Sequence, residues 1–383
     1  MVNRFVLNEM SYHGKGARSV LSTEIINRGF KKVLVVTDKA LYEAGVTAKV
    51  LDVLDNTGIE YEVYSDVKPN PTVTNVLNGL KICKEFGADV LVAVGGGSSI
   101  DTAKAIGIIA TNEEFSDVVS LEGTADTKNK ALPIIALPTT SGTAAEVTIN
   151  YVITDEETKT KMVCVDPHDI PIIAIVDSEL MASMPKMLAA ATGMDALTHA
   201  IEGYITKAAW ELSDMFHIRA IQNIFKYLPA AVNEKDEEAI EQMALAQYVA
   251  GMGFSNVGLG IVHSMAHQLG AVYDTPHGIA NAILLPHVMK YNGEVCYERF
   301  RDILIALGEP AKNMSKEGVI YTMVQKIKEL SASVGITQTV SDVGGREEDL
   351  EMLAKKAMND ACTPGNPRTP SVEDIIKIYR EAM

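Results

Sequence analysis

Short apolar runs alternate with segments of helical periodicity through the first half of the chain. A short apolar run between turn residues indicates a buried strand, and apolar positions three or four apart indicate a helix. Strands are therefore predicted at residues 32–38, 59–64, 89–94, 133–137 and 172–177. Helical spacing covers 39–55 and 100–110. This alternation predicts an open, largely parallel α/β sheet.

The pattern changes further along the chain. Residues 147–165 alternate on either side of a polar DEET turn, which predicts a β-hairpin attached to the sheet. From about residue 183 strand-like runs almost vanish, and helical periodicity covers 184–206, 211–228, 237–251 and 257–271. We therefore expect an α/β domain at 1–182 and an all-helical domain at 183–383, which a chain of 383 residues is long enough to form.

The composition of the chain limits which partners it can bind and in which compartment it is expected. The net charge of −16 disfavours nucleic acid and anionic membranes, since an acidic surface repels phosphate. The N-terminal segment MVNRFVLNEM lacks the long apolar region of a signal peptide, and no apolar stretch is long enough to span a membrane. The four cysteines are far apart, as is usual in a reducing cytoplasm. We therefore expect a cytoplasmic protein.

Histidines and one aspartate form a candidate metal site in the second half. Asp195 and His199 lie four residues apart, as do His263 and His267, so each pair shares one face of a predicted helix. His277 follows in a Thr-Pro-His-Gly turn that can aim its side chain inward. Carboxylate and imidazole together suit Fe²⁺, Zn²⁺, Mn²⁺ or Co²⁺. Neither spacing is specific to metal sites, so hydrogen-bonded core histidines are the alternative interpretation.

A glycine turn after the strand at 89–94 is a candidate nucleotide site. The segment Gly95-Gly96-Gly97-Ser98-Ser99 opens a predicted helix, and free N–H groups at such a helix start favour phosphate. The segment lacks the GxGxxG fingerprint, and a tight turn capped by Asp101 is the alternative. A second small-residue turn at 139–143 is expected to face the same ligand. Asp38 ends a strand, where a carboxylate favours NAD over NADP, although simple helix capping also explains it.

Taken together, these segments resemble the iron-containing (group III) alcohol dehydrogenases along essentially the whole chain. The resemblance is carried by GGGSSIDTAKAIG (95–107), LPTTSGTAAEVTINYVITDEETKTKMVCVDP (137–167), GMDALTHAIEGY (193–204), GFSNVGLGIVHSMAHQLGA (253–271), TPHGIANAILLPHVMKYN (275–292) and CTPGNPR (362–368). It implies a dehydroquinate-synthase-like fold, with an N-terminal α/β nucleotide domain and a C-terminal helical metal domain.

The resemblance also implies roles for individual residues. The family's metal ligands match Asp195, His199, His263 and His277, while His267 matches a histidine near the substrate that relays a proton. The substrate pocket would involve Asn150, Phe254 and Cys362. The nucleotide contacts would come from Asp38, Asn70, Gly96, Gly97, Ser98, Thr139, Thr140, Thr143 and Lys161.

The implied activity is NAD- and iron-dependent reduction of lactaldehyde to 1,2-propanediol, with oxidation of short diols in reverse and a place in fucose and rhamnose fermentation. Zinc also suits the ligand set. Activity on 1,3-propanediol, butanol or ethanol is the alternative within the family. A lyase of the 3-dehydroquinate synthase type is a remote one, because segments 193–204 and 253–278 supply almost no basic residues for a phosphorylated acid.

Residues 3–9 alternate like an edge strand that can pair with a second chain. We therefore expect a homodimer, although the family also forms larger rings.

Overall fold

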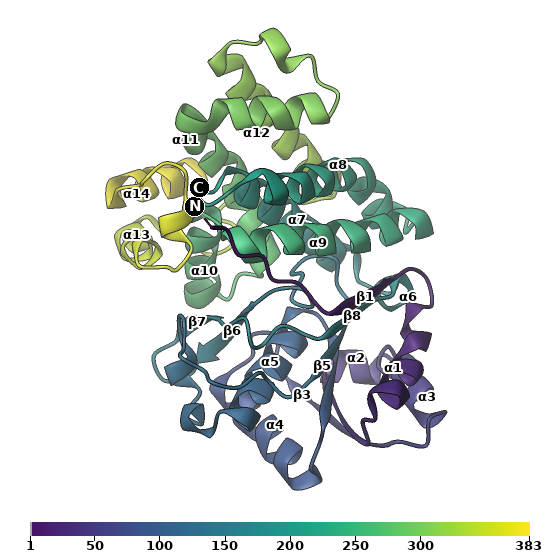
Figure 1. The fold of residues 1–383 in the computed structure, drawn as a ribbon. Coiled ribbons are helices and arrows are strands. Elements are labelled where there is room, and N and C mark those ends of the chain that lie inside the picture. The colour runs from purple at the N-terminus through teal and green to yellow at the C-terminus, as the bar shows by residue number, and fades with distance from the viewer. Residues whose placement is uncertain (1) are drawn as a thin grey trace. The chain divides into compact units, whose positions relative to one another are not determined.

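The computed structural model describes residues 2–383, and its contacts divide the chain into two compact units, one ending at Met184 and the other beginning at Pro185. The sequence placed the boundary at 182/183. Each unit is described by itself below, with the elements labelled as in Figure 1.

The first unit is built on a six-stranded, entirely parallel sheet (Figure 1). Its strands, in spatial order, are β1 (Met10–His13), β8 (Ile173–Val176), β5 (Ile134–Pro138), β4 (Val90–Gly95), β2 (Lys32–Asp38) and β3 (Glu60–Val67). The chain leaves β2 on one side toward β3 and returns on the other side to β4. The switch in strand order therefore falls between β2 and β4, which is where open α/β sheets bind ligands.

Both faces of the sheet are buried, which explains why its strands are continuous apolar runs. In β2, Leu34 and Val36 face a core shared with the helices α4 (Val73–Phe86) and α5 (Gly97–Thr111). Val33 and Val35, one position away, face the opposite core, which contains residues of α1 (Val20–Arg28) and α3 (Ala48–Asp55). The predicted parallel α/β sheet is confirmed.

One local prediction near the start of this unit was wrong. The single helix expected over 39–55 is two helices, α2 (Lys39–Glu43) and α3, because Gly45 between them has φ +74°, outside the helical region. In the single chain residues 3–9 form no strand, and the first strand, β1, starts at Met10 and pairs with β8. Pairing of 3–9 with a second chain stays a prediction.

The hairpin predicted at 147–165 consists of β6 (Asn150–Asp155) and β7 (Thr160–Val165), paired antiparallel. It is a separate two-stranded sheet, so its predicted attachment to the main sheet was wrong. Isolated bridges join it to loops at Thr72 and Gly123 instead. The β6 strand of this hairpin packs on α5.

The second unit is helical, as predicted, and residues 185–383 contain no strand. Its long helices are α7 (Lys186–Ile205), α8 (Glu211–Asn233), α9 (Glu237–Val257), α10 (Ile261–Tyr273), α11 (His277–Ala306), α12 (Lys316–Ser333), α13 (Leu350–Met358) and α14 (Val372–Glu381), with the short α6 (Ser178–Met181) preceding the unit. Within residues 2–383, no single helix meets the length and hydropathy needed to cross a membrane; α9 and α10 do so only as a pair bent by 103°.

Candidate active site

The glycine turn connects β4 to α5 at the carboxyl edge of the sheet. A Cβ atom on Gly95 would lie 2.3 Å from the hydroxyl of Ser99, so only glycine fits there. On Gly96 it would lie 3.2 Å from Thr140, and on Gly97 it would lie 3.0 Å from Thr143. The two small-residue turns predicted to share a ligand are therefore in contact, and backbone N–H groups at the start of α5 border this contact.

The other predicted nucleotide residues lie around the same edge. Lys161 of β7 donates a hydrogen bond to the side-chain oxygen of Asn70 at 3.0 Å. The Ser98 hydroxyl donates to the carbonyl of Pro69 at 2.5 Å. These contacts bring the turn at 69–72, the hairpin and the glycine turn together. The segments named for nucleotide binding thus form one continuous polar edge.

Asp38 ends β2, the strand next to β4. One of its carboxylate oxygens accepts a hydrogen bond from the Leu41 N–H at 2.9 Å and caps α2. The capping interpretation of Asp38 is therefore correct. Its place at the switch in strand order is also where an acidic residue contacts a ribose in dinucleotide sites.

Two charged side chains on α5, the buried Lys104 and the partly buried Asp101, hold β6 in place. The Lys104 ammonium donates to the carbonyls of Thr148 at 2.6 Å and Asn150 at 2.8 Å. The Asp101 carboxylate accepts the N–H of Val152 at 3.0 Å, and burial raises its pKa to about 7 against the opposing effect of Lys104. The predicted pocket residue Asn150 is thereby attached to the helix that carries the glycine turn.

Three of the four predicted ligands converge in the helical unit. Ligand atoms of Asp195, His263 and His277 all lie within 4.8 Å of one another. The Oδ1 of Asp195 is 3.8 Å from Nε2 of His263 and 3.6 Å from Nε2 of His277. Asp195 and His263 are buried, whereas 31% of the His277 side chain is exposed. The group is therefore enclosed on one side and accessible on the other.

His199 lies beside this group without being one of the three. Its Nδ1 is 4.0 Å from Oδ2 of Asp195, and its ring stacks on that of His263 with centroids 4.5 Å apart. The predicted pocket residue Phe254 also stacks on the His199 ring, with the two ring centroids 4.2 Å apart and an interplanar angle of 9°. Phe254 thus supports the orientation of the His199 ring.

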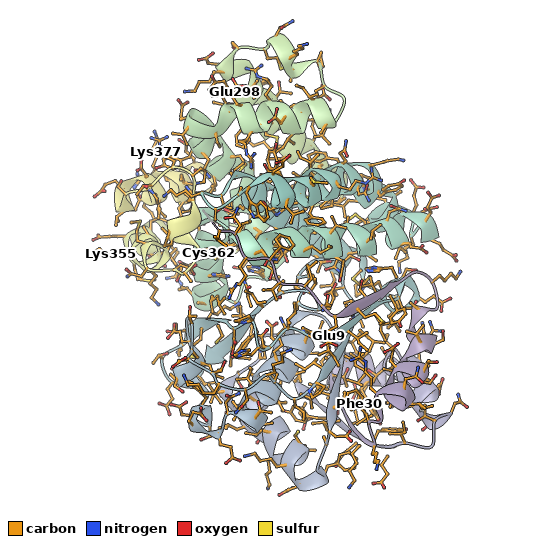
Figure 2. The ribbon with its side chains drawn as sticks, viewed as in Figure 1. Glu9, Phe30, Glu298, Lys355, Cys362 and Lys377 are labelled. Atoms are coloured by element: carbon orange, nitrogen blue, oxygen red, sulfur yellow. The ribbon has the colours of Figure 1, made fainter. Side chains whose placement is uncertain are left out.

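His267 is oriented differently from the three converging residues. Its Nδ1 lies 2.8 Å from a carboxylate oxygen of Asp360. Its ring centroid is 6.1 Å from that of His263 and 5.3 Å from that of His277. Cys362, labelled in Figure 2, lies two residues after Asp360 in this loop and donates its backbone N–H to the second Asp360 oxygen at 2.9 Å. His267 is thus not one of the residues whose ligand atoms converge, although its ring stacks on that of His277.

Burial controls the ionisation of the converging residues. It places the pKa of His263 well below the usual value, with the neighbouring His199, His277 and His267 adding to the effect. It raises the pKa of Asp195, against the opposing effects of His199 and Asn281. A neutral imidazole is the form that binds metals. A divalent metal would supply the positive charge that compensates the buried Asp195 carboxylate.

Comparison with known proteins covers both units. Residues 8–178 match the model of the iron-containing alcohol dehydrogenases, and residues 189–383 match the C-terminal model of that family. The chain belongs to the iron-containing alcohol dehydrogenase family. It is 55% identical to the lactaldehyde reductase of Escherichia coli K12 over 382 residues, which covers 100% of both chains.

Solved structures of family members share the fold. A 1,3-propanediol oxidoreductase superposes with a TM-score of 0.97 at 41% identity, covering 100% of both chains. A sulfoacetaldehyde reductase from Bifidobacterium kashiwanohense, solved in complex with NAD⁺, superposes with a TM-score of 0.89 at 28% identity, covering 100% of this chain and 99% of the other. The fold of this chain is accordingly the dehydroquinate-synthase-like one, as the resemblance implied.

The converging residues fit the iron that the family name implies. One carboxylate and two imidazoles offer the mixed oxygen and nitrogen donors that suit Fe²⁺ and Zn²⁺. The side-chain amide of Asn281 directs its N–H₂ group at the same three atoms, 2.7 Å from Asp195 and 3.2–3.3 Å from the two histidines. The three acceptor atoms of Asp195, His263 and His277 thus face one point, which is the arrangement that a bound cation requires.

The sequence analysis missed three polar residues that contact the histidines of this site: Glu202, Asn281 and Asp360. Glu202 lies 2.6 Å from Nδ1 of His263 and is buried, which raises its pKa to about 8. It is seven residues after Asp195, on the same helix face, so helical spacing is a signal that could have found it. Asn281 follows His277 by four residues and carries the same signal. Asp360 carries none.

Proposed function

We propose that the protein reduces lactaldehyde to 1,2-propanediol with NADH and iron, and oxidises short diols or alcohols in the reverse direction. The observation that carries the proposal is the convergence of Asp195, His263 and His277 in a chain matched over its full length by a lactaldehyde reductase. By the same resemblance we propose that it serves fucose and rhamnose fermentation.

The residues divide the chemistry between them. When bound, the metal supplies Lewis-acid polarisation of the substrate carbonyl, and NADH supplies the hydride. Asp195, His263 and His277 hold the cation, and the stacked His199 completes the donor set. The exposed side of His277 leaves room for a small substrate oxygen. Buried neighbours exclude water from the other sides, which strengthens the interaction with developing negative charge.

His267 supplies the proton in the reduction. Its Nδ1 is held by Asp360, so Nε2 is the nitrogen that can exchange a proton with the product oxygen or with a ribose hydroxyl. General acid catalysis by such an imidazole contributes about 10²–10⁴-fold. Asn150, Phe254 and Cys362 complete the substrate pocket in this proposal.

The cofactor is NAD(H). The pyrophosphate is assigned to Gly96, Gly97 and Ser98, where backbone N–H groups at the start of a helix favour anions. Thr139, Thr140, Thr143, Asn70 and Lys161 border the same turn, and Asp38 disfavours a 2′-phosphate. The NAD⁺ complex of the related sulfoacetaldehyde reductase supports this assignment.

A substrate panel tests the proposal. Anaerobically purified, iron-loaded protein is assayed with lactaldehyde, 1,2-propanediol, glycolaldehyde, 1,3-propanediol and butanol. The highest kcat/KM is expected with lactaldehyde among the aldehydes and 1,2-propanediol among the alcohols. A higher kcat/KM with 1,3-propanediol would favour the second candidate, a 1,3-propanediol dehydrogenase, which the 41% identity to a 1,3-propanediol oxidoreductase supports.

We also propose that the enzyme is cytoplasmic and forms a homodimer. All four cysteines are free thiols, as a reducing compartment requires. β1 is the edge strand of the sheet, and exposed apolar residues include Met10 within it and Val2 and Leu7 before it in the chain. Light scattering is expected to give twice the chain mass of 41.3 kDa, and a monomer or a larger ring would contradict the dimer.

A further inference from the structure

Two histidines on α10 are each held by a buried carboxylate that the assigned ligand set does not contain. His263 and His267 lie four residues apart on one helix face. Glu202 of α7 contacts the first at 2.6 Å, and Asp360, from the loop after α13, contacts the second at 2.8 Å. In both cases the contacted atom is Nδ1.

Glu202 is fixed by more than its histidine. Its side chain is 1% exposed, and its Oε1 accepts the N–H of Val262 at 2.7 Å. The start of α10 comes so close that a Cβ on Gly260 would lie 2.8 Å from the same oxygen. Glu202 therefore has one oxygen occupied by the helix start and the other directed at His263.

Asp360 has the same division of its two oxygens. Oδ1 accepts the N–H of Cys362 at 2.9 Å, and Oδ2 faces His267. When both carboxylates are ionised, each accepts the proton of its ring at Nδ1, so Nε2 is the nitrogen that can bind a metal or exchange a proton. On His263 it points at Asp195 and His277, whereas His267 lies outside that group.

We propose that Glu202 and Asp360 are positioning residues that assign the two histidines to different tasks: Glu202 presents Nε2 of His263 to the metal, and Asp360 keeps Nε2 of His267 for proton transfer. The inference rests on the proposed function, since it takes the metal and the aldehyde reduction from there. Carboxylates in this position typically improve metal affinity about 10–100-fold by fixing the ring and its tautomer.

The alternative is that Glu202 merely caps α10. Glu202→Gln separates the two roles, because the amide oxygen still accepts the Val262 N–H while the amide nitrogen can only donate toward Nδ1. That donor favours the tautomer with its proton on Nε2, which cannot coordinate a metal. Turning the amide over would oppose its nitrogen to the Val262 N–H and leave that donor without an acceptor, so the first orientation is favoured.

Asp360→Asn is the matched control. It makes the same change at the second histidine and keeps an oxygen for the Cys362 N–H. Zn²⁺ affinity is measured by competition with a chelating dye, on metal-stripped wild-type protein and both variants. We expect Glu202→Gln to weaken Zn²⁺ binding about 10–100-fold and Asp360→Asn to leave it within about twofold. With iron loaded, Asp360→Asn is expected to lower kcat about 10²-fold at unchanged KM for NADH.

Equal effects of the two variants on Zn²⁺ affinity, or none from Glu202→Gln, would overturn the inference. Absence of Zn²⁺ binding by wild-type protein would instead refute the metal centre of the proposed function. A second measurement needs no folded variant at Glu202. The ¹⁵N signals of histidine-labelled, metal-free wild-type protein report the tautomers above about pH 8, where Glu202 is ionised, and a proton on Nε2 of His263 there would equally overturn the inference.

Discussion

Asp38 carries two tasks that a single substitution can separate. One oxygen caps α2 through Leu41, and the charge is placed at the switch in strand order between β2 and β4. A helix cap needs only an oxygen acceptor, which asparagine also provides. Discrimination against a 2′-phosphate needs the negative charge.

Asp38→Asn is therefore expected to keep stability and raise the kcat/KM ratio of NADPH to NADH about tenfold, equivalent to about 1.4 kcal/mol. Asp38→Ala is expected to relax the preference similarly and to lose about 1 kcal/mol of stability with the cap. Steady-state kinetics and chemical denaturation measure the two effects. An unchanged ratio in both variants would leave Asp38 as a cap alone.

Predictability from sequence differs among the site residues. Glu202 and Asn281 lie at helical spacing from residues that were singled out, so local periodicity contains the information. Asp360 is 93 residues from His267 and reaches it only through tertiary packing, which no spacing rule encodes. The spacing likewise could not divide His263 from His267, because both share one face of α10. Their different carboxylate partners make the division.

At the scale of elements, three helices of the second unit meet around His217. The ring of this α8 residue lies so close to α7 and α9 that a Cβ on Gly203 or Gly253 would be 2.3 Å from its Nε2. Glycine is thus required at both positions by close approach. This contact brings together the helices that carry Asp195 and His199 on one side and Phe254 on the other.

Gly253→Ala is expected to destabilise the protein by about 1–3 kcal/mol, the usual cost of overpacking. Gly318→Ala on α12 is the matched control, because its added Cβ meets nothing closer than 3.5 Å. That substitution is expected to be neutral or to stabilise by up to about 1 kcal/mol. Urea denaturation gives both values. Equal effects would mean that helix propensity, and not contact with His217, determines the cost.

Elements were predicted well where they are long and regular, as in β2, β4 and the helices of the second unit. The errors have local or long-range causes. Gly45 breaks a periodic segment with one residue at positive φ. β1 is a four-residue strand whose partner, β8, begins 163 residues later, so its register depends on the finished sheet. The alternation of the hairpin strands predicts the hairpin itself. It does not show that the hairpin is separate from the main sheet or that it bridges to loops.

At the scale of the whole molecule, buried neutral histidine couples stability to pH. Burial lowers the pKa of His217 to about 3, and neither ring nitrogen has a hydrogen-bond partner among residues 2–383. The unfolded chain takes up this proton near the ordinary pKa of 6.5, whereas the folded chain does not. The contribution of neutral His217 to the free energy of unfolding is therefore fully present above pH 6.5 and is lost as the pH falls toward 3.

Metal-free protein is accordingly expected to lose about 3 kcal/mol through this group between pH 6.5 and pH 4. His217→Asn keeps a flat polar side chain and removes the titration. Its free energy of unfolding should fall less steeply over the same interval, whatever its value at neutral pH. Denaturant titrations at several pH values give the slopes. Identical slopes for the two proteins would contradict the role of His217.

In the proposed function, aldehyde reduction depends on a metal held by Asp195, His263 and His277. The most direct test is anaerobic titration of chelator-stripped protein with Fe²⁺, following NADH oxidation by lactaldehyde. Activity is expected to be absent at first and to rise to saturation at one Fe²⁺ per chain, with no rise in His263→Ala. Full activity of the stripped protein, or an equal rise in His263→Ala, would contradict the proposal.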